Sequence, residues 1–202
     1  MDYIKMSEMI YTGRYFDGSR AELIAKVQSG LSEYRFNHVL RVEAMAIALA
    51  QKWDVNPEKA SIGALTHDYA KERSDADFLA VIAAKHLDAD LVNWGNYIWH
   101  GVVGAEMVAD ELHIYDQEIL DAIRQHTTGA PYMTPLAKII YMADFVEIGR
   151  DFPGVAEVRQ LAMADLDASV GWQAKHTLEY LLKKETKVYP ASVYTYNAWA
   201  TK

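Results

Sequence analysis

The sequence predicts an all-α fold, a single domain in which helix packs on helix. Helix start and stop signals recur along almost the whole chain, whereas only residues 188–196 are rich in β-branched and aromatic side chains. No internal repeat, low-complexity tract or Gly/Ser-rich linker divides the sequence. A chain of 202 residues, 51% of them hydrophobic, is long enough to bury one substantial core.

Four helices are predicted in the first half of the chain. The first begins at a capping box formed by Ser19 and Glu22 and ends at Gly30. The third begins where Asn56 precedes Pro57, because Asn caps a helix and Pro is tolerated at its first position. The four predicted ranges are 19–30, 34–53, 56–71 and 74–86.

Four further helical patterns fill most of the second half. Their predicted ranges are 99–112, 116–126, 135–148 and 155–185. The last is interpreted as one long helix, with a break near Gly171 as the alternative. The tail of residues 188–196 follows a helix and contains Pro190, and its composition predicts an extended strap that returns across the domain.

Composition excludes several classes of function. The chain has no Cys, so it contains no disulfide, no thiolate nucleophile and no thiolate metal site. Its formal net charge is -8, whereas a non-specific nucleic-acid binder carries a basic excess. The longest apolar runs, 44–50 and 78–84, are far shorter than the roughly 20 residues that cross a bilayer, and residues 1–10 lack the apolar stretch of a signal peptide. The sequence predicts a soluble, cytoplasmic protein with neither nucleic acid nor membrane as partner.

Six ionisable side chains lie in register with apolar rows of the predicted helices. His38, for example, shares a helix face with Val42, Met45 and Leu49. Burying so many polar groups is unfavourable unless each finds a strong partner, and a bound cation is such a partner for imidazole and carboxylate. The candidate metal ligands are His38, His67, Asp68, His100, His126 and Asp144.

Any one of these positions alone is more often a hydrogen-bonded core residue than a ligand, so the interpretation rests on all six together. The adjacent pair His67 and Asp68 is the most specific feature. On one helix the two lie about 100° apart, so they reach a common metal only if other helices supply the remaining ligands. Asp68 has two oxygens and is able to bridge two ions. Three other histidines are assigned to structural roles: His86, His113 and His176.

Five segments together resemble the HD-domain phosphohydrolases, and within them the YqeK-type symmetrical dinucleoside tetraphosphatases. They are residues 35–42, 65–71, 100–105, 123–129 and 141–154. The order His, His-Asp, His, His, Asp is shared with other HD enzymes, whereas His-Thr-Thr-Gly at 126–129 and Gly-Arg-Asp-Phe-Pro-Gly at 149–154 are narrower signatures. The segment 93–99 is more aromatic than the family pattern.

The resemblance implies a helical HD-domain bundle over residues 1–202, with a metal core at about 34–150 and C-terminal helices and a strap at 151–202. In similar enzymes four residues hold one divalent metal, and the matching ones are His38, His67, Asp68 and Asp144. His100 and His126 match positions that hold a second metal or contact substrate phosphates. Iron is the metal that the resemblance implies. Manganese, nickel or zinc would also suit a site of His and Asp ligands without sulfur, and either one or two ions fit the pattern.

The resemblance further implies symmetrical hydrolysis of diadenosine tetraphosphate into two ADP by attack of a metal-bound hydroxide. A metal lowers the pKa of bound water from about 15.7 towards 7, which supplies that nucleophile at neutral pH. The residues expected to be catalytic are Asp68, Lys71 and Arg150. The residues expected to bind the substrate are Lys71, His100, His126, Thr127, Arg150, Val188, Tyr189 and Pro190.

Each of these roles has a structural alternative. Lys71 is equally explained as a solvated residue at a helix end, and Arg150 as a partner in a salt bridge with Asp151 or Glu147. The tyrosines of the tail are equally explained by packing. Three arginines are weaker candidates for phosphate binding, because each is able to pair with the acidic excess. They are Arg35, Arg41 and Arg124.

Two other functions stay open from the residues. One is an HD-type nucleotidase that acts on nucleoside mono- or triphosphates, and the other is a nucleotide-binding regulatory protein whose metal is structural. The full set of six candidate ligands argues against the second. The implied partners are a dinucleoside polyphosphate substrate and the ADP product, and a homodimer is compatible with the sequence.

Overall fold

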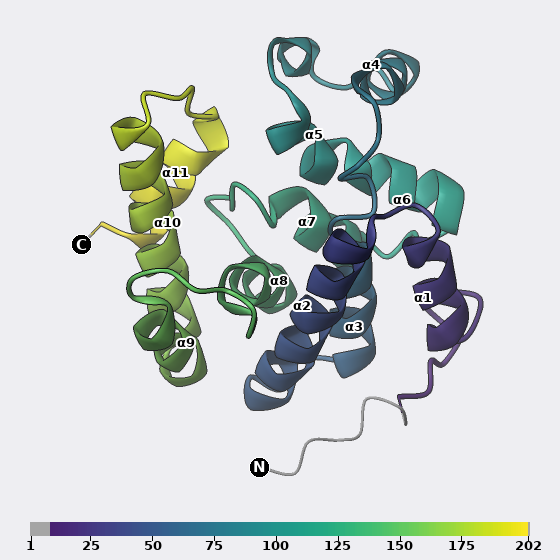
Figure 1. Ribbon diagram of the computed structural model, residues 1–202, viewed down its shortest axis with the longest axis horizontal. Helices are drawn as coiled ribbons and strands as arrows, with labels where there is room; N and C mark the ends of the chain where they lie inside the picture. Colours follow the sequence, from purple (N-terminus) through teal and green to yellow (C-terminus); the bar gives the residue numbers. More distant parts are fainter. Residues whose placement is uncertain (1–8, 202) are drawn as a thin grey trace.

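Helices make up the regular structure of the computed structural model, which describes residues 9–201 and contains no strand within that range (Figure 1). The prediction of an all-α fold is therefore confirmed. In chain order the described helices are α1 (Arg20–Gln28), α2 (Glu33–Lys52), α3 (Pro57–Thr66), α4 (Asp75–Ala84), the 3-10 helix η2 (Ala89–Asn93), α5 (Asn96–Val102), α6 (Gly104–Leu112), α7 (Gln117–Gln125), α8 (Pro135–Val146), α9 (Val155–Ala164), α10 (Leu166–Lys183) and α11 (Pro190–Trp199).

The centre of the fold is formed by α2, α3, α7 and α8, which pack against one another around the main hydrophobic core. Gly63 of α3 lies against Ile140 of α8, where a Cβ atom would come within 3.3 Å of the isoleucine side chain. The absence of that atom brings α3 and α8 close together. Both helices carry candidate ligands near their C-terminal ends, so this contact also sets the spacing of the site.

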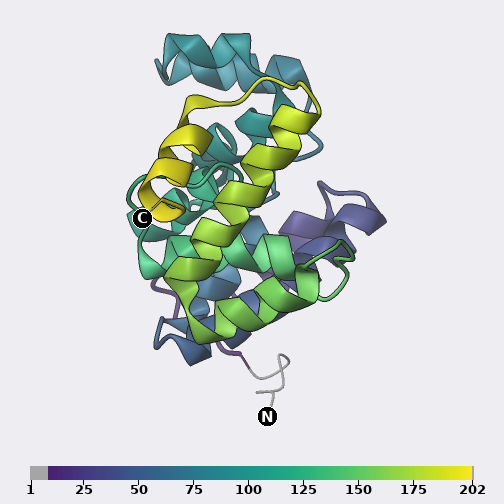
Figure 2. The same ribbon diagram turned by 90° about the vertical axis from the view of Figure 1, so that its left-hand side faces the viewer.

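Two groups of helices flank the centre on opposite sides (Figures 1 and 2). The elements α4, η2 and α5 share a smaller core with α6, which includes Phe78, Leu91 and Trp99. On the other side α10 packs on α8, α9 and α11. From α11 the buried Thr195 donates a hydrogen bond from Oγ1 to the carbonyl oxygen of Thr128, 2.9 Å away, in the loop between α7 and α8.

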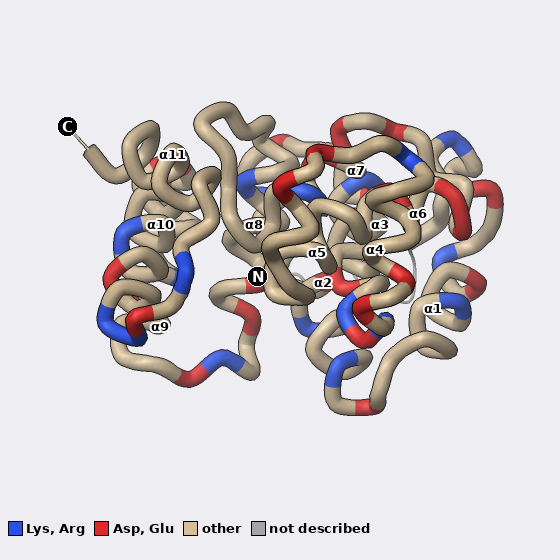
Figure 3. The backbone as a smooth tube through the Cα atoms, turned by 90° about the horizontal axis from the view of Figure 1, so that it is seen from above, with Lys and Arg blue, Asp and Glu red and all other residues tan. Residues whose placement is uncertain are grey.

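Charged residues are distributed over most of the described chain, although α5 and α11 contain no Lys, Arg, Asp or Glu. Figure 3 shows Lys and Arg interspersed with Asp and Glu along the backbone rather than gathered in one stripe. Some pairs join helices, as Lys59 of α3 does with Asp116 and Glu118 at the start of α7. Among the described helices, none combines the length and the apolar character that a bilayer crossing needs.

The predicted helix 99–112 is wrong, because the chain forms two helices there. α5 ends at Val102 and α6 begins at Gly104. A Cβ atom on Gly104 would lie 3.1 Å from the Cβ of Ala70. The chain therefore changes direction where a glycine allows a second segment to approach closely.

The predicted helix 155–185 also forms two helices, and the break lies at Asp165 instead of Gly171. The backbone of Asp165 is extended, with φ −151°, and its side chain accepts a hydrogen bond from the Ala168 N–H at 2.9 Å. Asp165 thereby caps α10, which is the ordinary role of Asp at a helix start. Gly171 lies inside α10.

Residues 190–199 form α11 instead of the predicted extended strap. Pro190 occupies the first turn, where its fixed φ and missing N–H favour a helix start. The carbonyl group of Trp199 packs directly on Gly171 of α10, where a Cβ atom would collide with it. Trp199 Nε1 also donates to the carbonyl oxygen of Ala130 at 2.9 Å. Tertiary packing therefore outweighs the β-propensity of this segment.

The other predicted helices are confirmed, with bounds shifted by a few residues. The predicted capping box of Ser19 and Glu22 forms, and a second one, of Ser74 and Asp77, opens α4. The third helix is shorter than predicted, because α3 ends at Thr66 and the residues up to Lys71 form turns.

We expect Gly171→Ala to lower the free energy of unfolding by about 1–3 kcal/mol, since overpacking a close helix contact costs about that much. Urea denaturation followed by circular dichroism measures the change. Gly30→Ala is the matched control, because its Cβ would meet only a carbonyl oxygen at 3.9 Å; we expect a change within about 0.5 kcal/mol there. Wild-type stability of Gly171→Ala would contradict the described packing.

Candidate metal centre

Candidate ligands from five parts of the chain meet in the interior. They form three overlapping groups, and within each group one ligand atom from every member lies within 4.8 Å of the others. The groups are His38, His67 and Asp68; His67, His126 and Asp144; and Asp68, His100 and His126. The structure thus brings all six predicted candidates together, and all but Asp144 are buried.

The C-terminal ends of three helices point at this cluster. α3 ends one residue before His67, which caps it, so Asp68 lies in the following turn and not on the same helix as predicted. His126 caps α7, and Asp144 lies in the last turn of α8. Helix C-termini carry partial negative charge, and each favours a nearby cation by about 0.3–1 kcal/mol.

All four imidazoles are oriented by a hydrogen bond at Nδ1. Every acceptor is a carbonyl or carboxylate oxygen, so Nδ1 carries the proton and Nε2 presents a lone pair to the interior. The Nδ1 acceptors and distances are Glu147 Oε1 for His38 (3.1 Å), the Ala64 carbonyl for His67 (2.7 Å), the Asn96 carbonyl for His100 (2.5 Å) and the Ile123 carbonyl for His126 (2.7 Å).

The four Nε2 lone pairs are crowded against other acceptors. His100 Nε2 is 3.1 Å from His126 Nε2, and His38 Nε2 is 3.0 Å from Asp144 Oδ1. Because the protons are on Nδ1, neither contact contains a hydrogen to share. His67 Nε2 is buried and has no hydrogen-bond partner among the described residues. His38 Nε2 is likewise buried without a hydrogen-bond partner among the described residues. Such a concentration of acceptors, two of them unpaired, fits a divalent cation.

The carboxylate of Asp68 faces both halves of the cluster. Its Oδ2 lies 3.5 Å from His67 Nε2 and 3.9 Å from His38 Nε2. Its Oδ1 lies 3.6 Å from His100 Nε2 and 3.8 Å from His126 Nε2. Each oxygen is therefore directed at a different pair of imidazoles, which is the geometry of a carboxylate able to bridge two ions.

The protonation states are those that metal coordination requires. Burial, assisted by neighbouring imidazoles, lowers the pKa of His100 to about 3 and the pKa of His126 to about 4. Burial alone would raise the pKa of Asp68 and of Asp144. Attraction to the imidazoles in their protonated form, together with Lys71 for Asp68 and Arg150 for Asp144, instead holds both pKa values below the ordinary value. At neutral pH both carboxylates are ionised and the two imidazoles are neutral.

Lys71 and Thr127 lie on the His100 side of the cluster. Lys71 Nζ is 3.0 Å from His100 Nε2, and burial lowers the pKa of the ammonium group. Lys71 is therefore not the solvated helix-end residue of the alternative interpretation. Thr127 Oγ1 is 3.0 Å from Nε2 of both His100 and His126, so its single proton serves one of them at a time.

Two arginines bind the carboxylates from outside. Arg35 Nη1 donates to Asp68 Oδ2 at 2.8 Å, and Arg150 Nη2 donates to Asp144 Oδ1 at 2.6 Å. Arg150 Nε also lies 3.9 Å from Glu147 Oε1, so the salt bridge with Glu147 considered above exists. The carboxylate that accepts a hydrogen bond from Arg150, however, is Asp144. The side chains of Asp144 and Arg150 are 23% and 39% exposed, so solvent reaches the cluster on this side.

Other predicted residues lie outside the cluster. Val188 and Tyr189 precede α11 and Pro190 opens it, and the ring of Tyr189 contacts Trp94. Arg41 and Arg124 form salt bridges with acidic residues. Three histidines stay outside as predicted, with the first two exposed and the third stacked on an indole ring: His86, His113 and His176.

Glu147 is the residue that sequence reasoning missed. It is buried, and it accepts from His38 Nδ1 while Arg41 Nε donates to its other oxygen at 2.7 Å. A signal was present, because Glu147 follows Asp144 by three residues and Arg41 follows His38 by three, so each pair shares a helix side. A carboxylate behind a metal-binding imidazole fixes the ring and raises its basicity.

The comparison with known families agrees with this geometry. Residues 35–149 match the family described as HD domain. This match covers more than half of the 202 residues, and the chain belongs to the HD domain family.

Individual relatives within this family give a more specific comparison. The chain is 42% identical over 179 residues to the symmetrical bis(5'-nucleosyl)-tetraphosphatase of Bacillus subtilis, with 89% of this chain and 96% of the relative covered. A protein of the same name from Halalkalibacterium halodurans is 38% identical with the same coverage. A crystal structure from Clostridium acetobutylicum, described as a predicted HD superfamily hydrolase involved in NAD metabolism, is similar with a TM-score of 0.85 at 30% identity, over 90% of this chain and 97% of that chain.

We expect the metal-free protein to lose stability as the pH falls. The pKa of His100 and His126 is lower in the folded chain than the ordinary 6.5, so the unfolded chain takes up protons first. The contribution of these two histidines to the free energy of unfolding is therefore fully present above about pH 6.5 and is lost as the pH falls towards 4. Urea denaturation at several pH values with a chelator present measures it, and His126→Asn should reduce the dependence. A constant or rising stability on acidification would contradict this.

We expect Glu147→Gln to weaken metal binding by about ten- to a hundredfold, because loss of a carboxylate behind a ligating imidazole has that effect. Competition with a chromophoric chelator measures the affinity without any need for turnover. Glu157→Gln is the matched control, since Glu157 is exposed on α9, and it should bind metal as the wild type does. Wild-type affinity in Glu147→Gln would refute the role assigned to this carboxylate.

Proposed function

We propose that this chain is a metal-dependent hydrolase that cleaves diadenosine tetraphosphate symmetrically into two ADP. The observation that carries the proposal is the convergence of imidazole Nε2 lone pairs and two carboxylates at one buried point. The shared name of the relatives, symmetrical bis(5'-nucleosyl)-tetraphosphatase, supports the substrate class.

The proposed cofactor is one or two divalent cations, and the two-sided arrangement of Asp68 favours two. The ligands would be His38, His67, Asp68 and Asp144 for one ion, and Asp68, His100 and His126 for the other. With a single ion, His100 and His126 would contact the substrate phosphates instead. Iron is the proposed metal, and manganese, nickel or zinc would also suit these nitrogen and oxygen donors. A bound divalent cation lowers the pKa of water towards 7.

The cationic residues around the cluster are proposed to bind the phosphates. Lys71 and Arg150 would donate to phosphoryl oxygens and stabilise the negative charge that develops there. Arg35 is available too, because its Nε is buried and has no hydrogen-bond partner among the described residues. Thr127 would add a hydroxyl donor beside two of the imidazoles. Asp68 would keep its two oxygens directed at the two halves of the cluster.

The nucleoside is proposed to lie towards the start of α11. Val188, Tyr189 and Pro190 offer an aromatic ring and backbone groups there. The tyrosine is only partly exposed, so its ring is held in one place by its surroundings.

We further propose that residues 1–202 form one HD domain, with the metal core at about 34–150 and the C-terminal part at 151–202. The protein would act in the cytoplasm, with no nucleic acid or membrane as partner. All proposed ligands come from one chain, so the site is complete without a homodimer.

The test is hydrolysis of diadenosine tetraphosphate by purified protein loaded with iron or manganese. We expect ADP as the only nucleotide product on anion-exchange chromatography. Asp68→Ala should lower kcat by about a thousandfold or more, because it removes a carboxylate that faces both halves of the cluster. Asp167→Ala, at an exposed position of α10, should keep wild-type activity. Formation of ATP and AMP, or full activity in Asp68→Ala, would exclude the proposal.

A further inference from the structure

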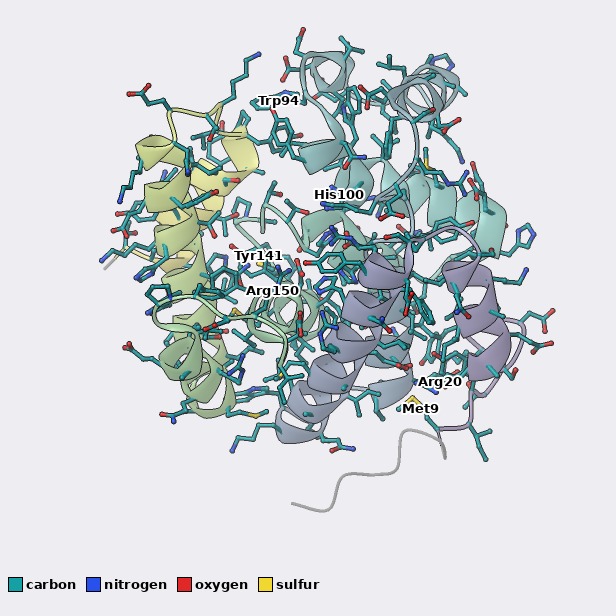
Figure 4. All side chains as sticks on the ribbon, viewed as in Figure 1. Met9, Arg20, Trp94, His100, Tyr141 and Arg150 are labelled. Atoms are coloured by element: carbon teal, nitrogen blue, oxygen red, sulfur yellow. The ribbon has the colours of Figure 1, made fainter. Side chains whose placement is uncertain are left out.

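An aromatic surface lies beside the metal cluster and takes no part in it. Trp94 lies between η2 and α5, and Tyr97 lies in the first turn of α5. Both side chains are accessible to solvent, Tyr97 to 49%. His100 is on α5 with Tyr97, and a rise of about 1.5 Å per residue places it about 6 Å along the axis from Asn96. Asn96 Nδ2 donates to the carbonyl oxygen of Lys71 at 3.0 Å, so the start of α5 adjoins the cluster. Figure 4 shows Trp94 and His100 in the same flank of the molecule, with Trp94 on the side that faces α11.

Trp94 is held in a fixed orientation by its neighbours. Its Nε1 donates to Asp90 Oδ2 at 2.8 Å. Its ring meets the ring of Tyr189 at a centroid distance of 4.8 Å and an angle of 87°, which is an edge-to-face contact. Both residues pack against the smaller core of α4, η2 and α5, although Tyr189 directly precedes α11 of the opposite flank. In an edge-to-face pair, the ring that presents its edge keeps both of its faces free of that contact.

The aromatic surface and the metal cluster differ in the charge of the residues around them. Burial first, and then the carboxylates of Asp88 and Asp90, raise the pKa of Tyr189, so these acids lie near its ring. A phosphate group is disfavoured beside them, whereas an uncharged base is not. Around the cluster the charges are reversed, with Lys71 and Arg150 among the cationic groups. For a nucleotide with its phosphates at the cluster, the aromatic rings are therefore a more favourable place for the base than for a further phosphate group.

We propose that Trp94 is a nucleobase-stacking residue that acts together with Tyr189, so that the base of the substrate stacks on this aromatic pair. This inference rests on the proposed nucleotide hydrolysis at the neighbouring cluster. Stacking would make Trp94 a specificity-determining residue, because a stacked base favours binding of nucleoside-capped polyphosphates over bare polyphosphate. Every base has a stackable face, so adenine and guanine dinucleoside tetraphosphates should bind with similar affinity.

The kinetic test compares Trp94→Ala, Trp94→Phe and the wild type on diadenosine tetraphosphate. Trp94→Ala should raise KM about tenfold or more and leave kcat within about twofold, since stacking contributes to binding and not to the chemical step. Trp94→Phe should retain most of the affinity because it keeps a flat ring. Tyr180→Ala, an exposed aromatic position on α10, is the matched control and should keep the wild-type KM. An unchanged KM in Trp94→Ala would overturn the inference.

A second measurement separates this inference from the proposed function. Titration of the metal-loaded protein with ADP should quench tryptophan fluorescence, and the quenching should be smaller in Trp94→Phe, whereas inorganic tripolyphosphate should cause none that depends on Trp94. If the protein binds ADP in this way but hydrolyses no dinucleotide, the proposed function fails and the stacking site stands. Equal quenching in wild type and Trp94→Phe would overturn the stacking site even in an active enzyme. Circular dichroism of each variant verifies that the fold is intact.

Discussion

Hydrogen bonds that point away from the candidate metal centre determine its chemistry. Because every Nδ1–H of the four imidazoles is taken by a fixed oxygen, every Nε2 lone pair has to face inward. The lone pairs then oppose one another and the carboxylates at about 3 Å. A cation removes this opposition, and since it binds the folded chain and not the unfolded one, it also stabilises the fold.

Core packing and site geometry are two results of the same helix arrangement. Gly63 lets α3 lie close to α8, and the ends of these helices deliver His67 and Asp144 to one point. The ligands are therefore attached to helices whose apolar faces are held by the hydrophobic core. Arginines satisfy the carboxylates from the outer side, which explains how ionised acids are accommodated at such burial.

Local signals in the sequence were sufficient for most helices and for the candidate ligands. The capping box at Ser19 depends on a few consecutive residues, and His38 was visible because its helix row is otherwise apolar. Contacts between distant segments were not visible. The helix α11 depends on packing against Gly171, and Glu147 joins the site through Arg41, a residue about a hundred positions away in sequence. Propensity and periodicity carry no information about such pairs.

The contact between α11 and the loop after α7 connects the chain terminus to the imidazoles. Thr195 holds the carbonyl group of Thr128 and leaves no room for a side chain on Gly129. These residues follow His126 by two and three positions. A truncation that removes α11, or a bulky fusion that displaces it, would free this loop although α11 supplies none of the candidate metal ligands. Affinity tags are therefore better placed away from α11, and inactivity of a shortened chain would reflect a displaced imidazole and lost nucleoside contacts, not a missing metal ligand.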